Sequence, residues 1–99
     1  MDLIRVQGSD PESFLHKLTR ALAGGELGRI TKFDLKDDDF CIRFSGLGES
    51  RIWFTLEREE SGFLATKKRE KIALLHLAFR QEMEKNLEGV LIRLGAEIS

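Results

Sequence analysis

The residues best suited to binding chemistry are four cations in the short segment ATKKREK, residues 65–71. Lys67, Lys68, Arg69 and Lys71 could hold phosphate groups, because cationic side chains form strong hydrogen bonds with phosphate oxygens. The segment is expected to begin a helix, where the helix dipole favours acidic residues by about 0.3–1 kcal/mol each. Cations at such a position indicate either a binding surface or a solvated surface that tolerates them.

A second candidate site surrounds Trp53, the single tryptophan of the chain, on the predicted outward side of a β-hairpin. Arg51 flanks it in sequence, and a predicted pairing of Phe44 with Ile52 places Arg43 opposite the indole. An uncovered indole beside guanidinium groups could stack on a base, a planar ligand or a partner's side chain. The alternatives are that Arg43, the N-terminal segment LIRV or a second subunit covers the ring.

The groups that an enzyme would need are scattered along the chain. Cys41 is the only cysteine, and its predicted side chain faces away from the core. His76 falls within the apolar stripe of the predicted last helix and is expected to be partly buried with one hydrogen-bond partner, or else to have a pH-sensitive or interface role. His16 is expected on the solvated side of the first helix. Because a nucleophile needs a base within hydrogen-bond reach, we expect a protein that is not an enzyme.

Acidic and glycine-rich segments do not match ligand-binding patterns either. Asp37, Asp38 and Asp39 lack the glycine and the bidentate glutamate of a calcium loop, so a solvated turn is expected. The stretch GLGES holds two glycines but precedes a strand, which predicts a hairpin turn and no phosphate loop. No Cys and His residues have zinc-site spacing. We therefore predict no metal and no cofactor.

Composition indicates one small soluble domain. The chain has 99 residues, of which 41% are hydrophobic and 33% charged, and this suits a single α+β domain over residues 1–99. The net charge of −1 produces no chain-wide attraction to nucleic acid or to an anionic membrane. The sequence shows neither an apolar run of the roughly 20 residues that a bilayer requires nor a signal peptide. We expect a cytoplasmic protein without membrane contact.

The first predicted elements are a short strand over residues 3–6 and a helix over residues 11–23. Asp10 suits the helix N-cap and Pro11 its first turn, while Gly24 follows its end. Its apolar face repeats every four residues.

Three antiparallel strands are expected next, over residues 27–36, 39–45 and 51–58. The second and third alternate between apolar and polar residues, which predicts one buried face. The inward set is Phe40, Ile42, Phe44, Ile52, Phe54 and Leu56.

One long helix is expected from Thr66 to about Leu94, with an alternative in which Gly89 ends it and residues 90–94 form a strand. Its apolar stripe consists of Ile72, Leu75, Phe79, Met83, Leu87, Val90 and Leu94. Further apolar residues lie off the stripe and need cover from another side: Leu74, Leu77, Leu91 and Ile92.

This order, with cations at the start of the last helix, resembles the double-stranded-RNA-binding domain over residues 11 to about 85. In the stretch KKREK, Lys67, Lys68 and Lys71 match the Lys-Lys-x-x-Lys motif with which that family approaches phosphates. The resemblance implies that these lysines contact duplex RNA. The chain departs from the family in the bulky stretch IALLHLAF after the motif and in the absence of histidine from the loop SGLGES.

The predicted fold is therefore α+β in the order (β)αβββα, with an antiparallel sheet of three to four strands packed against an N-terminal helix and a long C-terminal helix. The leading functional hypothesis is a non-enzymatic module that self-associates, as a homo-oligomer, or binds a protein partner. It rests on the apolar surplus of the last helix and on outward Trp53.

The alternative hypothesis is nucleic-acid binding, RNA before DNA, by the basic segment with help from the hairpin. Glu57, Glu59 and Glu60 precede the cations and could neutralise them through exposed ion pairs. The residues that would make the partner or nucleic-acid contact are Lys67, Lys68, Arg69, Lys71, Arg43, Arg51 and Trp53.

Overall fold

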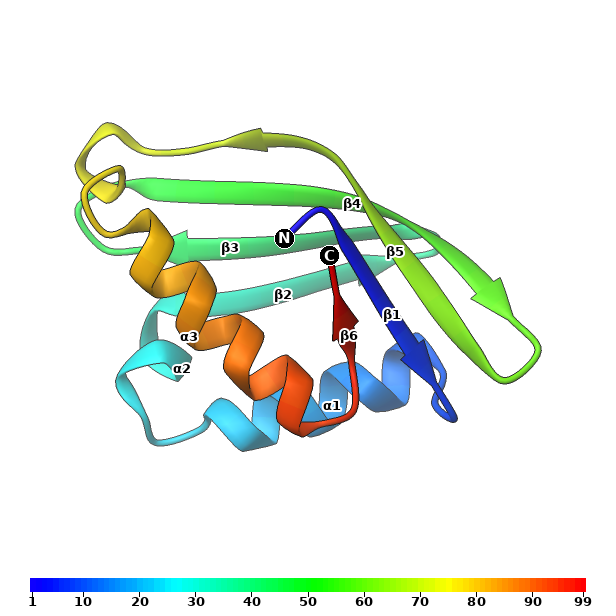
Figure 1. Ribbon diagram of the computed structural model, residues 1–99. Helices are drawn as coiled ribbons and strands as arrows, with labels where there is room; N and C mark the ends of the chain where they lie inside the picture. The colour runs from blue at the N-terminus through cyan, green and yellow to red at the C-terminus, as the bar shows by residue number, and fades with distance from the viewer.

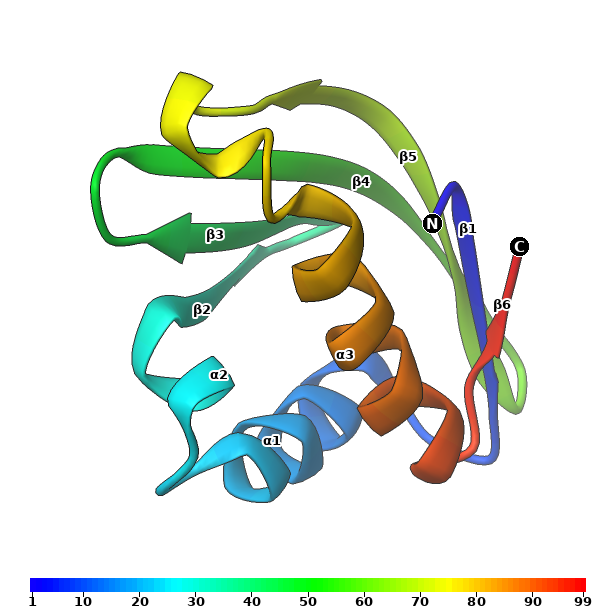
Figure 2. The ribbon, with the colours of Figure 1, turned by 60° about the vertical axis from the view of Figure 1, so that its left-hand side comes forward.

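The computed structural model describes residues 1–99 and shows a six-stranded antiparallel sheet whose helices all lie on one face (Figure 1 and Figure 2). The strands lie side by side in the order β2-β3-β4-β5-β1-β6. The α+β class is confirmed, whereas the predicted strand number and element order are wrong. In chain order the elements are β1 (Leu3–Gln7), α1 (Pro11–Leu22), α2 (Glu26–Ile30), β2 (Thr31–Lys36), β3 (Asp39–Ser45), β4 (Glu49–Glu59), β5 (Gly62–Lys71), the short 3-10 helix η1 (Leu74–His76), α3 (Arg80–Arg93) and β6 (Glu97–Ile98).

The segment predicted to begin the long helix is a strand. Residues 62–71 form β5, which pairs with β4 on one side and with β1 on the other. The last helix begins only at Arg80. The basic segment therefore lies in the sheet, and the conflict between its cations and a helix dipole does not arise. The order of elements also differs from that of the double-stranded-RNA-binding domain.

Helix α2 replaces the first half of the strand predicted over residues 27–36. Its Gly28 lies against the end of α1, where a Cβ atom would come within 2.0 Å of the Leu22 carbonyl oxygen. Only glycine permits this approach, so the chain turns back tightly between α1 and β2. Only the second half of the predicted segment forms a strand, which is β2.

The first helix forms where its cap signals predicted. The Asp10 carboxylate accepts a hydrogen bond from the backbone N–H of Ser13 at 2.8 Å, which lowers the pKa of Asp10, and Pro11 occupies the first turn. A second tie joins α1 to the sheet, because Arg58 donates two hydrogen bonds to Glu12, at 2.8 and 2.6 Å. The bond to Arg58 lowers the pKa of Glu12 to about 2.

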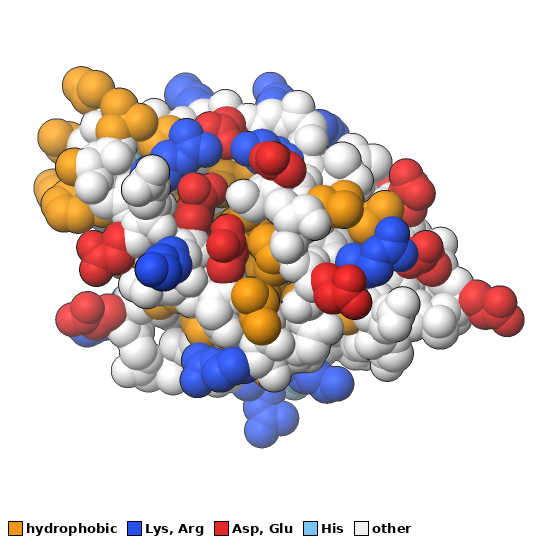
Figure 3. Space-filling model, in the orientation of Figure 1, with side chains coloured by type: hydrophobic (Ala, Val, Ile, Leu, Met, Phe, Trp, Pro, Cys, Tyr) orange, Lys and Arg blue, Asp and Glu red, His pale blue; other side chains and the backbone are white.

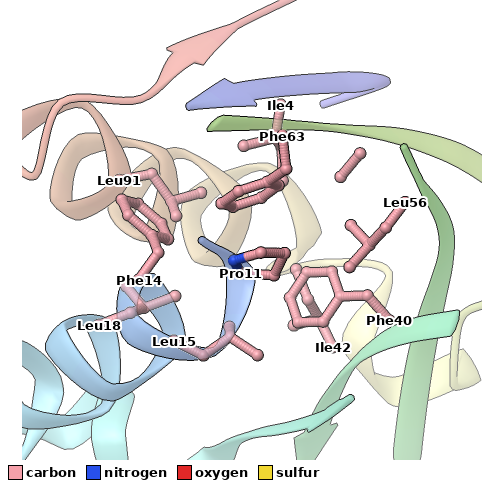
Figure 4. Close-up of a pocket in the computed structure, with 11 residues that line it drawn as sticks. Ile4, Pro11, Phe14, Leu15, Leu18, Phe40, Ile42, Leu56, Phe63 and Leu91 are labelled. Atoms are coloured by element: carbon pink, nitrogen blue, oxygen red, sulfur yellow. The ribbon is translucent and has the colours of Figure 1, made fainter. Parts of the chain in front are cut away.

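The core lies between the helices and the concave face of the sheet. Figure 4 shows α1 and α3 contributing Phe14, Leu18 and Leu91 toward Ile4 and Phe63. The Phe14 and Phe63 rings meet edge to face at 5.8 Å. All six residues predicted to face inward from β3 and β4 are buried here: Phe40, Ile42, Phe44, Ile52, Phe54 and Leu56.

The last helix continues through Gly89, so the alternative with a strand over residues 90–94 is wrong. It buries Leu87, Val90 and Leu91, and of these Leu91 had been placed off the apolar stripe. The chain then ends in β6, which pairs with β1. None of the helices combines the length and the apolar character that crossing a membrane would require.

The pairing of β3 with β4 differs from the predicted register by two residues. Ile42 lies opposite Ile52 and Arg43 opposite Arg51, whereas Phe44 had been paired with Ile52. The turn is shorter than the predicted register requires, because Ser45 pairs with Glu49 and leaves only residues 46–48 between them. A shift of two residues leaves each side chain on its predicted face, so the core was predicted correctly despite the wrong register.

Candidate functional site

One end of the molecule exposes large hydrophobic side chains from two separate segments. The turn between β3 and β4 contributes one leucine, and the chain around η1 contributes the others. We call this surface the apolar end, and Figure 3 shows hydrophobic side chains gathered there. Its members are all more than half exposed: Leu47, Leu74, Leu75, Leu77 and Phe79.

A hollow of about 400 Å³ adjoins the apolar end on the helical side of the sheet. Glu26 and Glu82 are the only charged residues that line it, and neither forms an ion pair. Its apolar lining comes from three elements and two loops: Leu27, Ile30, Leu47, Leu75, Phe79 and Met83. The hollow is therefore suited to an apolar side chain from outside the chain.

Leu47 occupies an unusual backbone conformation at the tip of its turn. Its φ is 55°, in the left-handed region, and Gly46 and Gly48 on either side also have positive φ. Bulky residues are rare there, whereas glycine, asparagine and aspartate are common. Leu47 is nevertheless 80% exposed and contributes nothing to the core. A strained and exposed leucine indicates a role outside the folded chain.

A partly buried hydrogen-bond network, centred on His76, fixes the apolar end to the sheet. The Gly46 carbonyl can only accept, so His76 donates from Nε2 to it at 2.6 Å, which leaves Nδ1 to accept from the Ser50 hydroxyl, also at 2.6 Å. Ser50 in turn accepts a hydrogen bond from the backbone N–H of Ala73 at 2.8 Å. One imidazole thus joins η1 to the turn that carries Leu47. It has two partners, where one was predicted.

The open face of the sheet carries a line of cations that we call the cation row: Lys32, Arg43, Arg51 and Lys71. One comes from each of four neighbouring strands, and consecutive members are direct cross-strand partners. Arg43 and Arg51 were predicted site residues, but the predicted register did not place them opposite each other. The row therefore emerges only from the observed pairing.

The carboxylates near the cation row are too few to neutralise it. Asp34 accepts from Arg43 at 2.6 Å, which raises the pKa of Arg43, and Glu49 is shared between Arg43 and Arg51 at 3.5 and 3.1 Å. The lysines at the two ends of the row form no ion pair. The row consequently retains an excess of positive charge.

Trp53 lies beside the cation row on the same face of the sheet, two residues along β4 from Arg51. Its partner across the sheet is Arg69, whose guanidinium carbon stands 4.1 Å from the ring centre. Arg69 therefore covers the indole, whereas the sequence had placed Arg43 there. On the other side Trp53 pairs with Cys41, whose thiol is buried among these side chains on the open face, and burial raises its pKa.

The four cations of segment 65–71 are separated by the strand. Lys67 bonds to Asp2 and Glu70 at 3.0 and 2.9 Å, and these bonds raise its pKa. Lys68 pairs with Asp39 at 2.8 Å. Only Arg69 and Lys71 have no carboxylate partner.

The glutamates that were expected to neutralise this segment do not do so. Glu59 pairs with Arg5 instead, while Glu57 and Glu60 form no ion pair. The carboxylates that pair with the basic segment are Glu70, which lies within it, and Asp2 and Asp39 from elsewhere in the chain.

The structure keeps the possible catalytic groups apart. Cys41 lies on the open face and His76 on the covered face, as the sequence predicted, and His16 is exposed. Asp38 and Asp39 form ion pairs with Arg58 and Lys68 near the predicted turn. No three His, Cys, Asp or Glu side chains lie close enough together to hold a metal ion.

Sequence reasoning missed Lys32 and Leu47. A signal for Leu47 was present, since leucine between two glycines is unusual in a hairpin turn. Lys32 gave no signal, because its place in the cation row depends on the strand register.

Comparisons of the chain with protein-family models, with curated proteins and with solved structures found no match.

Proposed function

We propose that this protein is an interaction module that self-associates through its apolar end. In the dimer, Leu47 of each copy enters the hollow beside the apolar end of the other. The observation that carries the proposal is Leu47 itself, held outward with a φ of 55° and 80% exposed. The strained backbone at Leu47 stabilises no contact within the monomer. Burial of the Leu47 side chain by a partner would account for it.

The size of the apolar end fits a dimer interface. Five exposed Leu and Phe side chains present on the order of 500 Å² together, at the upper end of what single-chain proteins expose as one patch. A standard interface buries about 800 Å² on each partner, an apolar centre with a polar rim included. Glu26 and Glu82 at the hollow would belong to that rim.

The arrangement favours a second copy of the chain as the occupant. A projecting leucine and a hollow that can receive one lie side by side on the same surface. A two-fold axis lying in the interface plane brings the projection of each copy onto the hollow of the other, so both contacts form at once. The network through His76 holds the two parts in fixed relation, which reduces the ordering cost of association.

Sedimentation equilibrium over about 1 to 100 µM protein tests the proposal, with dimerisation expected in the micromolar range. The informative variant is Leu47→Asn. Asparagine tolerates positive φ better than leucine, so the monomer should keep or gain stability while association weakens at least tenfold. A loss of association therefore cannot be attributed to unfolding.

Ile92→Asn provides the matched control. Ile92 is also an exposed, branched apolar residue, but it lies on α3 away from the apolar end. This variant should associate like the parent protein. A strict monomer at about 100 µM, or an equal effect of the two substitutions, would overturn self-association and leave the apolar end to a different protein partner.

A further inference from the structure

The cation row places like charges where a sheet is least able to tolerate them. Arg43 faces Arg51, and on either side these residues face Lys32 and Lys71. Like charges directly opposite each other destabilise a sheet. Only salt or a neighbouring carboxylate reduces this repulsion. Nothing in the packing requires cations at these positions, because the open face is not covered by a helix. The row is best accounted for by an anion that binds from outside the chain.

The surplus of charge is local to one half of the open face. Around Trp53 the cations outnumber the carboxylates, although the chain as a whole has a net charge of −1. The cations are Lys32, Lys36, Arg43, Arg51, Lys68, Arg69 and Lys71, and the carboxylates are Asp34, Asp39 and Glu49. An extended polyanion would therefore be attracted to this half alone.

The spacing of the row suits a chain of phosphates. Neighbouring strands lie about 4.8 Å apart, so four cations in register extend over roughly 14 Å at right angles to the strands. A few nucleotides of an extended single strand cover this distance. Because consecutive members of the row are direct cross-strand partners, a phosphodiester backbone that crosses the strands could contact them in turn.

The planar groups beside the row suit a base. The guanidinium carbon of Arg69 lies over the Trp53 ring, 4.1 Å from its centre, and Arg69 has no carboxylate partner. Guanidinium and indole planes both stack on nucleobases. An unpaired base could extend this stack or replace Arg69 on the indole. The stack lies two residues along the strands from the row, because Trp53 and Arg69 pair there as Arg51 and Lys71 pair within the row.

We infer that the open face binds single-stranded nucleic acid, with the cation row on successive phosphates and the Trp53–Arg69 stack on a base. A duplex fits less well because its bases are already stacked on one another. An anionic membrane surface would use the cations but not the stack. The inference is independent of self-association, because every residue in it belongs to one copy.

Two signals from the same titration test the inference at about 50 mM salt. Fluorescence anisotropy of labelled oligo(U) and oligo(dT) of about 10 nucleotides reports binding, and the emission of Trp53 reports stacking. Trp53 is the only tryptophan and the chain has no tyrosine, so the emission comes from this site. Both oligonucleotides should bind and quench Trp53, and a tighter oligo(U) complex would indicate contacts to the ribose hydroxyl. A logarithmic salt slope of about −3 is expected from four phosphate contacts.

The decisive variant is the double substitution Lys32→Gln and Lys71→Gln. Both side chains are exposed and form no ion pair, so the fold should not change. Affinity at about 50 mM salt should fall at least tenfold, and the salt slope should fall by about 1.4. The matched control, Lys17→Gln with Lys85→Gln, removes two exposed and unpaired lysines from α1 and α3. It should bind like the parent protein.

A third variant, Trp53→Leu, separates stacking from charge. It should bind about fivefold or more weakly, with the salt slope unchanged. Three results would overturn the inference: no anisotropy change at about 50 mM salt, an equal loss in the two lysine double variants, or binding without any change in Trp53 emission. The last result, together with equally tight binding of inorganic polyphosphate, would indicate a general polyanion site. Leu47→Asn should bind oligonucleotide normally, so failure of self-association would not affect this test.

Discussion

One face of the sheet is packed against the helices and the other is open. Trp53 and Phe54, which are neighbours on β4, lie on opposite faces and show the contrast. Phe54 is fully buried on the covered face, 5.6 Å from the Phe40 ring. Trp53 is half-buried on the open face, beneath the guanidinium of Arg69. Packing determines the residues of the covered face. The open face instead brings like charges into register, and a departure of this kind from local consistency indicates a functional surface.

The largest expected effect is a difference in stability between alanine variants of these two neighbours. Phe54→Ala should lower the free energy of unfolding by about 3–5 kcal/mol, because it leaves a cavity where the sheet meets the helices. Trp53→Ala should cost less than half as much, since water and Arg69 already contact the ring. Urea unfolding followed by circular dichroism measures both, and it does not depend on the tryptophan signal. Equal costs would mean that the open face is a second core and no binding surface.

The next effect concerns the two histidines. His76→Ala leaves the buried Ser50 hydroxyl without its acceptor, and a buried polar group left unpaired costs about 1–3 kcal/mol. The Gly46 carbonyl also loses its donor, but it lies in an exposed turn where water can replace the imidazole. The same substitution at exposed His16 should change stability little. Thermal unfolding of the two variants gives the comparison. If His76 also positions the apolar end, the remaining folded protein should dimerise more weakly, and unchanged dimerisation would remove that role.

The covered face could be predicted because its signals are local. Asp10 and Pro11 determine where α1 begins, and strict alternation in β3 and β4 determines which side chains enter the core. Alternation survives an error of two residues in register, because the side-chain period is two. The core was therefore obtained from the sequence even though the turn at Leu47 was assigned the wrong length.

The cation row could not be predicted because it depends on pairing between distant strands. Lys71 faces Arg51 only if residues 62–71 form a strand, and β5 is stabilised partly by pairing with β1 at the other end of the chain. Phe63 and Leu64 are both apolar, so the alternation of β5 is weak in the sequence. One local signal did oppose a helix, since four cations at its expected start conflict with the helix dipole. That conflict was evidence for a strand.

The smallest effect tests the repulsion in the cation row directly, through one substitution made at two positions. Lys71 faces Arg51, whereas Lys36 faces Asp39, and both lysines are exposed strand residues on the open face. Lys71→Thr should therefore raise the free energy of unfolding by about 0.2–1 kcal/mol at low salt, while Lys36→Thr should lower it.

Added salt should bring the two variants together, because it screens repulsion and attraction alike. Thermal unfolding at about 20 mM and about 500 mM salt, on the same preparations used for oligonucleotide binding, measures both shifts. A Lys71→Thr protein that is more stable but binds oligonucleotide more weakly would show that this cation is kept against the stability of the sheet. Equal and salt-independent shifts would mean that the row carries no repulsion, and the argument for an external anion would then lose its physical basis.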